Sequence, residues 1–398
     1  MMKKIGFLVP HLQDGGLARV LQMLTLGLSN QYEVHVILLL GNRPINMPIK
    51  GNVIKLCEEG NGFFGKAITF LKRIKLVKKL KKDYDFDIVF SFGPSANSVN
   101  ILTKSSEIVI ISEHNVPSIE HKIQGTSGKV YESMMYLYKY ADLIVAVSEH
   151  IRDDLVENYH LDKKKISVIY NGLDIDYINM LSEKSVDISF MKDKINIICV
   201  SALVPQKGLW HIIRIMPLLI KYNPNIQLIL VGKGEQEKCL KKLVHALALD
   251  EYVIFLGYQS NPFPYVKKSQ VFVFPSVHEG FSMAFLEAMC LKVPVVASDC
   301  KSGPREVLAD NADYSNTLTD GWYAPYGILC PNMWLDGVDK NDDLTENEMI
   351  FYETLKRLLS DKSLLKRYSA EGYKRCLDYS NKKMVEMYEK VFLSFLCG

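Results

Sequence analysis

The sequence contains two series of short apolar segments, most of which are followed by a helical pattern. In the first series, residues 5–9 are apolar throughout, which predicts a buried strand. Residues 34–40 predict a second strand, and the helical pattern between the two has its apolar residues on one face (Leu17, Val20, Leu21, Leu24 and Leu28). A strand, a helix and a strand in this order predict a βαβ unit with parallel strands.

The same alternation continues along the chain and predicts an α/β fold. Further strands of the first series are expected at 88–92, 108–111, 143–147 and 166–170. A second series of strands is expected at 195–200, 226–231, 253–256, 271–274, 293–297 and 327–330. Residues 173–194 lack apolar periodicity and should connect the two series, whereas the Asp- and Asn-rich residues 332–346 should form a loop. A chain of 398 residues is too long for a single core, so two domains are expected.

The composition excludes several classes of protein. Hydrophobic residues make up 48% and charged residues 23%, as in globular domains rather than disordered or fibrous chains. A net charge of +3 does not indicate a nucleic-acid-binding protein. The eight cysteines form no CxxC pair, and Cys199, Cys290 and Cys330 lie in apolar runs, so we expect buried thiols and a cytoplasmic location. The sequence predicts neither a signal peptide nor a transmembrane helix.

Residues 66–82 predict a basic amphipathic helix. The apolar positions form one stripe, and the remainder includes eight Lys or Arg residues and no acidic residue (stripe: Ala67, Phe70, Leu71, Ile74 and Val77). Such a helix can lie on an anionic membrane surface. The alternative is a peripheral helix that packs its stripe on the sheet and turns its lysines to solvent.

Polar residues and glycines follow several strands of the first series. Gly15 and Gly16 follow the first strand, where they allow a ligand to approach the backbone or simply form a tight turn. His114, between Glu113 and Asn115, follows the strand at 108–111. Because ligands of parallel sheets gather at the carboxyl ends of the strands, His114 is a candidate site residue, the alternative being a structural histidine.

The richest pattern in the second series runs from 276 to 287. A buried strand, a glycine-containing turn and a helix follow one another here, so that backbone N–H groups at the helix N-terminus point at one place and attract phosphate. Glu279 and Glu287 flank this turn, and carboxylates accept hydrogen bonds from sugar hydroxyls. Together these groups predict a nucleotide-sugar pocket. The alternative is a surface helix with solvated glutamates.

A candidate cation lies in the turn after the strand at 195–200. Lys207, in the segment Val-Pro-Gln-Lys-Gly at 204–208, can provide a point charge for a diphosphate. A Gly-Lys-Gly turn at 232–234 follows the next strand, and the pair of turns favours this interpretation over an ordinary surface lysine.

These motifs, with Gly257-Tyr258 and the glutamates at 279 and 287, come in the order seen in retaining family 4 glycosyltransferases. The segment Gly-Pro-Arg-Glu at 303–306 is similar to bacterial members that build surface polysaccharides and glycolipids. The resemblance covers nearly the whole chain and implies the GT-B fold, in which two Rossmann-like αβα domains face each other across a cleft. It implies an N-terminal acceptor domain (1–176), a linker (177–194), a donor domain (195–380) and a terminal helix (381–398) that packs back on the first domain.

The resemblance also implies a role for each motif. Lys207 and the backbone of Gly280, Phe281, Ser282 and Met283 would hold the donor diphosphate, while Glu287 would bind the ribose and Glu279 the sugar hydroxyls. His114 would contact the sugar near the reacting carbon. The remaining expected donor-site residues are Gly15, Gly16, Gly232, Gly257, Tyr258 and Arg305. No covalent nucleophile is expected.

The chain departs from the family at one position. Ala202 stands where the family usually has an arginine that binds the diphosphate, so another cation, such as Arg305 or Arg19, would have to compensate, or donor binding would be weaker. Two acidic triplets, at 85–87 and 174–176, do not follow a strand's carboxyl end. We therefore expect no metal site and no metal cofactor.

The predicted function is transfer of a hexose or N-acetylhexosamine from a nucleotide sugar, most simply a UDP-sugar, to a saccharide or lipid-linked acceptor. The expected partners are the nucleotide sugar, a polyprenyl-linked acceptor and an anionic membrane at the inner face. Loops of the first domain, including residues 115–130, would select the acceptor. Two alternatives are a UDP-sugar 2-epimerase of the same fold and a non-catalytic relative that binds a glycan or protein.

Overall fold

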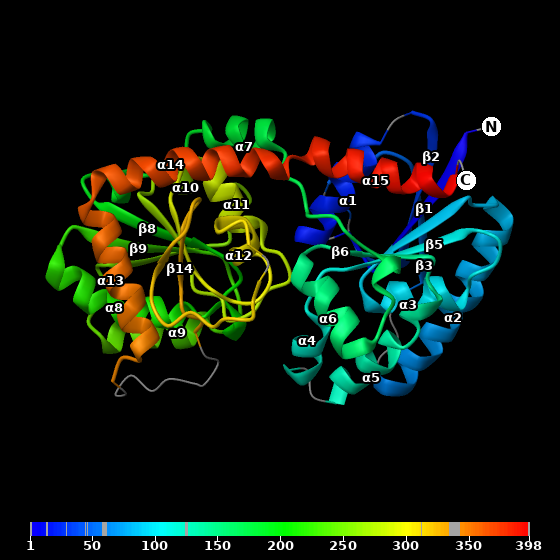
Figure 1. The fold of residues 1–398 in the computed structure, drawn as a ribbon, viewed down its shortest axis with the longest axis horizontal. Helices are drawn as coiled ribbons and strands as arrows, with labels where there is room; N and C mark the ends of the chain where they lie inside the picture. Colours follow the sequence, from blue (N-terminus) through cyan, green and yellow to red (C-terminus); the bar gives the residue numbers. More distant parts are fainter. Residues whose placement is uncertain are drawn as a thin grey trace. The chain divides into compact units, whose positions relative to one another are not determined.

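The structure, a computed structural model, describes residues 2–12, 15–28, 30–43, 45, 47–57, 62–123, 126–311, 313–333 and 343–396. The chain forms two compact units (Figure 1). Unit 1 comprises Met1–Gly172 and Asn381–Gly398, and unit 2 comprises Leu173–Ser380. Each unit contains a seven-stranded sheet with helices on both faces, which confirms the predicted α/β class and the two Rossmann-like domains.

The sheet of unit 1 is parallel, with the order β3-β2-β1-β4-β5-β6-β7. The strands are β1 (Lys3–Val9), β2 (Tyr32–Leu40), β3 (Asn52–Cys57), β4 (Ile88–Phe92), β5 (Ile108–Glu113), β6 (Leu143–Ala146) and β7 (Ile166–Val168). Alternate residues face opposite sides, so that Phe7 and Val9 lie in one core and Leu8 lies in the other. Only the edge strand β3 was not predicted from the sequence.

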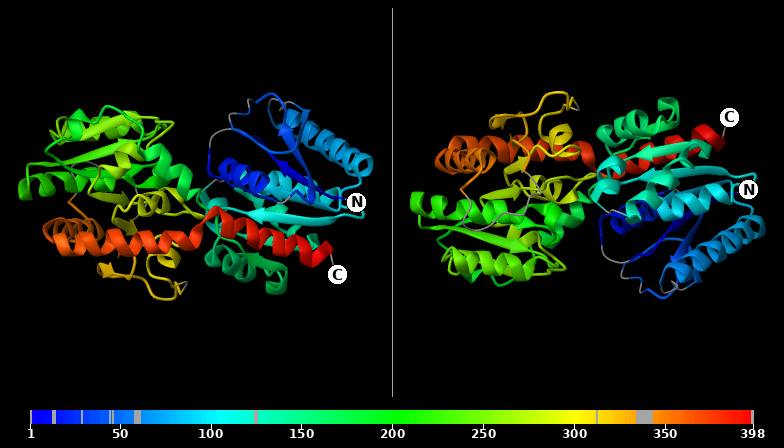
Figure 2. Two further views of the ribbon diagram at one scale, coloured as in Figure 1. Left: turned by 90° about the horizontal axis from the view of Figure 1, so that it is seen from above. Right: turned by 90° about the horizontal axis from the view of Figure 1, so that it is seen from below.

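Helices α1 (Gly16–Gly27) and α15 (Asn381–Leu396) cover one face of this sheet, and α2 (Gly62–Tyr84) and α3 (Pro94–Leu102) cover the other. In Figure 2, α15 is the red helix that lies against the elements of unit 1. The remaining helices are α4 (Pro117–Ile123), α5 (Thr126–Met135), α6 (Glu149–Tyr159) and the short helices Tyr138–Tyr140 and Lys163–Lys165. The segment 115–130, which we expected to be a loop, is therefore largely helical.

The sheet of unit 2 has the order β10-β9-β8-β11-β12-β14-β13, and only the β13–β14 pair is antiparallel. The strands are β8 (Ile195–Val200), β9 (Ile226–Val231), β10 (Val253–Gly257), β11 (Val271–Phe274), β12 (Val295–Ser298), β13 (Trp322–Tyr323) and β14 (Ile328–Cys330). All six strands predicted for the second series are present. The five interior strands are largely apolar because both faces of the sheet are covered by helices.

In Figure 1, α8 (Leu209–Tyr222), α9 (Glu237–Ala246) and α13 (Glu346–Ser360) lie on one side of this sheet, and α10 (Phe263–Lys267) and α11 (Met283–Cys290) lie on the other. Helix α14 (Lys362–Cys376) contacts both α11 and α13. The remaining elements are α7 (Ile175–Ser182), α12 (Pro304–Leu308) and the short helices Ser189–Met191, Pro205–Lys207 and Leu377–Tyr379. Cys199, Cys290 and Cys330 are buried free thiols, as predicted.

The segment at 177–194 is not a separate linker. It belongs to unit 2, where α7 packs against α10 and α11 and buries Ile178 and Leu181. The acidic triplet at 174–176 opens α7, since the Asp174 side chain accepts a hydrogen bond from the backbone N–H of Tyr177. Of the loop expected at 332–346, residues 334–342 lie outside the described residues, and Glu346 begins α13.

Helix α2 buries only part of the predicted apolar stripe: Val77 lies in a core of unit 1, and Phe70 and Ile74 pack against that core. Arg73 and Lys81 are buried together with Val77, whereas Leu71 is 65% exposed and Ile68 is 55% exposed. Lys81 is held inside by an ion pair of 2.6 Å with Glu107 and by hydrogen bonds to Asn100. In the part of the chain that the structure describes, no helix is long and apolar enough to span a bilayer.

Candidate active site

The loop that carries Lys207 is fixed against the segment after β11. Gly208, which follows Lys207, has a φ of 58°, and a Cβ there would come within 2.3 Å of the Pro275 carbonyl oxygen, so the close approach requires glycine. The backbone N–H of Val277 donates to the carbonyl of Gln206 at 2.8 Å. The loop after β8 and the loop after β11 are therefore joined through their backbones.

This junction brings Lys207 and Glu279 into contact. Lys207 Nζ forms an ion pair and a hydrogen bond with Glu279 Oε1. The two side chains are only 16% and 8% exposed, so water screens the pair less than it would at an open surface. The sequence predicted both residues at one site, and the structure places them side by side at the carboxyl end of the unit 2 sheet.

Helix α11 begins immediately after this turn. Its N-cap, Ser282, makes no side-chain cap hydrogen bond, so the first N–H groups of the helix depend on other partners. The Ser302 hydroxyl donates a hydrogen bond to the carbonyl of Gly280 and so helps to fix the turn before α11. Glu287, one turn before the end of α11, is 8% exposed. Thus two carboxylates and a helix N-terminus lie on one short segment.

Two glycines, Gly232 and Gly257, lie at the carboxyl ends of β9 and β10 in unit 2. A Cβ at Gly232, whose φ is 146°, would come within 1.8 Å of the Ser201 carbonyl oxygen, and the Gly232 N–H donates to the Gly257 carbonyl at 2.9 Å. The loops after β8, β9 and β10 are therefore in direct backbone contact. Tyr258, which follows β10, exposes half of its surface, and Lys233 Nζ lies 4.9 Å from the centre of its ring.

Arg305 does not behave as the replacement cation that the sequence suggested. Its guanidinium forms a two-pronged ion pair with Asp299 and donates to the carbonyl oxygens of Asp313 and Asn316. The side chains of Arg305 and Asp299 are 4% and 5% exposed. Because these partners engage both prongs of Arg305 inside unit 2, the structure gives no support to a phosphate-binding role. Ala202 is exposed two residues after β8.

In unit 1, His114 directly follows β5. Its Nε2 lies 3.0 Å from Ser112 Oγ, and burial lowers the pKa of the imidazole to about 4, so the ring is neutral near pH 7. Glu113 accepts hydrogen bonds from the backbone N–H groups of His114 and Asn115 and from the Tyr138 hydroxyl, while burial raises the pKa of its carboxyl to about 7.

Sequence reasoning missed the residues that support His114 from other elements. Tyr138 comes from a short helix 24 positions later in the chain, and Asn97 on α3 donates to the Tyr138 hydroxyl at 2.8 Å. No local pattern marks either residue, because their role depends on packing between elements far apart in the sequence.

Gly15 and Gly16 lie at the start of α1 in unit 1. A Cβ at either position would meet no described atom within 4 Å. The backbone of Gly15, with a φ of 155°, favours glycine, whereas no described neighbour requires glycine at Gly16. They follow β1, which ends at Val9, in the chain order that the sequence predicted.

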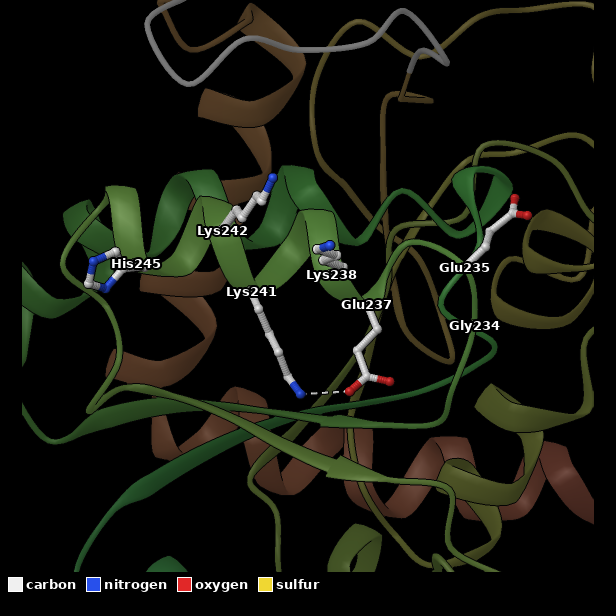
Figure 3. Close-up of a pocket in the computed structure, with 7 residues that line it drawn as sticks. All are labelled: Gly234, Glu235, Glu237, Lys238, Lys241, Lys242 and His245. Carbon is white, nitrogen blue, oxygen red and sulfur yellow. Dashed lines mark hydrogen bonds and ion pairs between the residues drawn. The ribbon is translucent and has the colours of Figure 1, made fainter.

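A separate hollow lies over α9 (Figure 3). Its lining includes Lys238, Lys241, Lys242 and His245, and Lys241 forms an ion pair of 2.7 Å with Glu237 on the preceding turn. The hollow adjoins the glycine turn through Gly234, but none of the site residues predicted from the sequence lines it. We therefore regard it as a basic helix surface.

Comparison with known proteins identifies both halves of the chain. Residues 14–177 match the family described as "Glycosyltransferase Family 4", and residues 182–323 match "Glycosyl transferases group 1". An uncharacterised glycosyltransferase of Methanocaldococcus jannaschii is 31% identical over 333 residues, which cover 79% of this chain and 81% of that protein. The chain belongs to the family 4 glycosyltransferases.

Relatives of this glycosyltransferase include enzymes named for glycan synthesis. N-acetylgalactosamine-N,N'-diacetylbacillosaminyl-diphospho-undecaprenol 4-alpha-N-acetylgalactosaminyltransferase of Campylobacter jejuni is 28% identical and covers 96% of this chain and 97% of its own. The amylovoran biosynthesis glycosyltransferase of Erwinia amylovora is 22% identical over 98% of this chain and 99% of its own. The resemblance predicted relatives of this kind, which are named for bacterial polysaccharide and glycolipid synthesis.

Solved structures establish the fold type of the glycosyltransferase. HepE of Anabaena in complex with UDP superposes with a TM-score of 0.71 at 17% identity and covers 98% of this chain and 100% of its own. Sucrose-phosphate synthase of Thermosynechococcus elongatus superposes with a TM-score of 0.72 at 15% identity, with 99% of each chain covered. Both similarities support the fold alone, and they confirm the predicted GT-B type.

Among the residues that the structure describes, no three or more His, Cys, Asp or Glu side chains are grouped so that they could hold a metal ion. The expectation that the glycosyltransferase works without a metal stays a prediction, tested below.

Proposed function

We propose that this glycosyltransferase transfers a hexose or N-acetylhexosamine from a UDP-sugar to a lipid-linked saccharide, with retention of anomeric configuration, during surface polysaccharide or glycan synthesis. The observation that carries the proposal is the pairing of Lys207 with Glu279 at the turn that leads into α11. A cation and a helix N-terminus suit a diphosphate, and partly buried carboxylates suit sugar hydroxyls.

In the proposed complex each group has a distinct task. Lys207 and the backbone N–H groups of 281–284 bind the diphosphate and stabilise the negative charge that develops as it departs. Glu287 accepts hydrogen bonds from the ribose hydroxyls, and Glu279 accepts them from the transferred sugar. Before the donor binds, the pair with Glu279 keeps the Lys207 ammonium in position. The half-exposed ring of Tyr258 contacts the base.

The residues of unit 1 complete the proposal. Gly15 and Gly16 allow the diphosphate to approach the backbone at the start of α1, because neither has a side chain. His114 contacts the transferred sugar. Since burial keeps its imidazole neutral near pH 7, His114 acts as a hydrogen-bonding group rather than as a cation.

The comparisons support the choice of donor and acceptor. HepE is described in complexes with UDP and with UDP-glucose, which favours a UDP-sugar donor. The name of the Campylobacter relative specifies an undecaprenol-linked acceptor and an α linkage, which favours a lipid-linked acceptor here and retention from an α-linked donor.

A donor screen tests the proposal. Isothermal titration calorimetry should show binding of UDP and weaker binding of GDP and CMP, and Lys207→Gln should weaken UDP binding while Lys241→Gln on the exposed face of α9 should not. When a UDP-sugar that binds in this screen is mixed with an undecaprenyl-diphosphate-linked saccharide, mass spectrometry should detect one added sugar on the saccharide. NMR should show that the anomeric configuration of this sugar is retained. Release of an epimerised sugar without any acceptor would instead show a 2-epimerase.

The outer face of α2 supports a further part of this proposal, contact with an anionic membrane. Burial of Arg73 and Lys81 leaves six lysines on the exposed face of the helix (Lys66, Lys72, Lys75, Lys78, Lys79 and Lys82). Ile68 and Leu71 are more than half exposed among them. Apolar side chains within a lysine-rich face suit a lipid headgroup region, where each lysine contributes about 1 kcal/mol.

Vesicle sedimentation tests this contact with a control of equal charge. Binding to vesicles containing phosphatidylglycerol should weaken with salt and fall in the variant Lys72→Gln, Lys78→Gln, Lys79→Gln. The control Lys238→Gln, Lys241→Gln, Lys242→Gln removes three lysines from α9 and should bind as the wild type does. Ile68→Ser with Leu71→Ser should also weaken binding. Equal partitioning of all four proteins would contradict a membrane role for α2.

A further inference from the structure

The hydrogen bonds of Ser112 determine which nitrogen of His114 carries the proton. Ser112, the penultimate residue of β5, is fully buried, and its Oγ lies 3.0 Å from His114 Nε2 and 3.2 Å from the carbonyl oxygen of Ser91. A carbonyl oxygen only accepts hydrogen bonds, and a serine hydroxyl has one proton. If both contacts form, Ser112 donates to Ser91 and His114 Nε2–H donates to Ser112 Oγ.

The same arrangement defines the chemistry of the other ring nitrogen. Burial lowers the pKa of His114 to about 4, so the imidazole near pH 7 carries a single proton. With that proton on Nε2, Nδ1 has a lone pair and acts as an acceptor. The ring is further positioned by Phe92, whose ring centre lies 5.8 Å from that of His114. A hydroxyl group is the natural partner for such an acceptor.

We propose that Ser112 is a positioning residue for glycosyl transfer: its hydroxyl holds His114 with the proton on Nε2, so that Nδ1 accepts a hydrogen bond from a hydroxyl of the donor sugar. The donor contact of His114 is itself part of the proposed function, and Ser112 adds the group that orients it. A donor that lacks the matching hydroxyl would leave Nδ1 without its partner and would bind less well.

Ser91 on the neighbouring strand provides a matched control. It is also fully buried, and its hydroxyl donates to Asn97 Oδ1 at 2.8 Å and accepts from Asn100 Nδ2 at 3.1 Å. The Ser112 hydroxyl contacts Ser91 through the backbone carbonyl of Ser91 and not through its side chain, and Ser91→Ala retains this carbonyl. The two substitutions Ser91→Ala and Ser112→Ala therefore remove similar buried hydroxyls, but only the second changes the bond to His114.

The first measurement reads the proton position without any substrate. Long-range ¹H–¹⁵N correlation spectra of the full-length protein labelled with ¹⁵N-histidine, assigned with His114→Gln, should show protonated Nε2 and unprotonated Nδ1 in the wild type and in Ser91→Ala. In Ser112→Ala both resonances should move toward the average of the two tautomers. A proton on Nδ1 in the wild type, or an unchanged spectrum in Ser112→Ala, would overturn the assignment.

The second measurement reads the consequence for the donor. Ser112→Ala should raise KM for the UDP-sugar by about five- to tenfold, the value of one hydrogen bond, with a smaller change in kcat, and Ser112→Thr should restore it. A monodeoxy donor that lacks the contacted hydroxyl should bind equally to the wild type and to Ser112→Ala. If Ser91→Ala raises KM equally, the effect is structural and the positioning role fails.

The spectra and the kinetic measurements together distinguish the positioning role of Ser112 from the proposed function. If the wild type transferred no sugar from any nucleotide sugar, the donor contact would be overturned, while the spectra would still decide the tautomer. If transfer is normal and the spectra change without a change in KM, Nδ1 does not receive a donor hydroxyl.

Discussion

Removing the Arg305 side chain should separate the stability of unit 2 from its affinity for nucleotide. Arg305 makes two bonds to Asp299 and donates to the carbonyl oxygens of Asp313 and Asn316, and almost none of either charged side chain reaches solvent. Arg305→Ala leaves the Asp299 carboxylate buried without its cation. Loss of one partner of a buried pair costs about 3–5 kcal/mol, so we expect a decrease of that size in the free energy of unfolding.

Lys207→Ala should have the opposite effect: it should lower UDP affinity more than the free energy of unfolding. It removes one charge-assisted contact to the diphosphate, which contributes about 1.5–3 kcal/mol, or roughly a 10- to 150-fold loss in UDP affinity. Arg305→Ala, by contrast, should bind UDP within about threefold of the wild type at temperatures where it is folded. A second substitution, Asp299→Ala, should recover part of the stability lost in Arg305→Ala, because it removes the unpaired carboxylate.

Thermal unfolding and UDP calorimetry together check this reasoning. A loss of 3–5 kcal/mol corresponds to a midpoint lowered by about 6–20 °C for a unit of this size. If Arg305→Ala unfolds as the wild type does and loses as much UDP affinity as Lys207→Ala, then Arg305 binds phosphate and the structural interpretation is refuted.

Four further outcomes are expected. Glu287→Ala should weaken UDP binding by on the order of 2–3 kcal/mol, because a charge-assisted hydrogen-bond pair is lost, whereas Glu235→Ala should not; equal affinities by calorimetry would remove Glu287 from the site. Ala202→Arg should tighten UDP binding by about tenfold by adding a second cation, and an unchanged Kd would show that position 202 does not reach the diphosphate. Transfer should persist in excess EDTA; loss of activity that Mn²⁺ or Mg²⁺ restores would reveal a metal requirement. Burial raises the pKa of Glu113 from 4.5 to about 7, so its protonated form stabilises the fold below pH 4.5 and this contribution is lost as pH rises to 7. The free energy of unfolding should fall by about 3 kcal/mol over that range, and urea titrations of Glu113→Gln should lack this component.

The sequence predicted the interior strands of both sheets and missed two edge strands, β3 and β13. Central strands such as β4 and β11 consist almost entirely of apolar residues because helices cover them on both sides. The edge strand β3 has partly or largely exposed residues throughout, including Lys55, so its composition does not distinguish it from a loop.

Helix α2 shows why burial within an element is harder to predict. The apolar stripe pointed to Leu71, but the structure buries Lys81 instead, because Glu107 and Asn100 provide partners from distant parts of unit 1. The same limit applies to the site. The order of the motifs predicted Lys207, Glu279 and Glu287, whereas the partners of Arg305 depend on contacts that no local pattern contains.

The assignment of α15 to unit 1 has a consequence for the order in which the protein folds during synthesis. Met384, Tyr388 and Phe392 of this last helix lie in the same core as Phe7 and Leu21 near the N-terminus. Synthesis proceeds from the N-terminus, so unit 1 lacks these side chains until α15, which follows unit 2 in the chain, has been made. Unit 2, which is continuous from Leu173 to Ser380, can complete its core earlier. Unit 1 therefore begins to be synthesised before unit 2 but can complete its core only after unit 2 has been made.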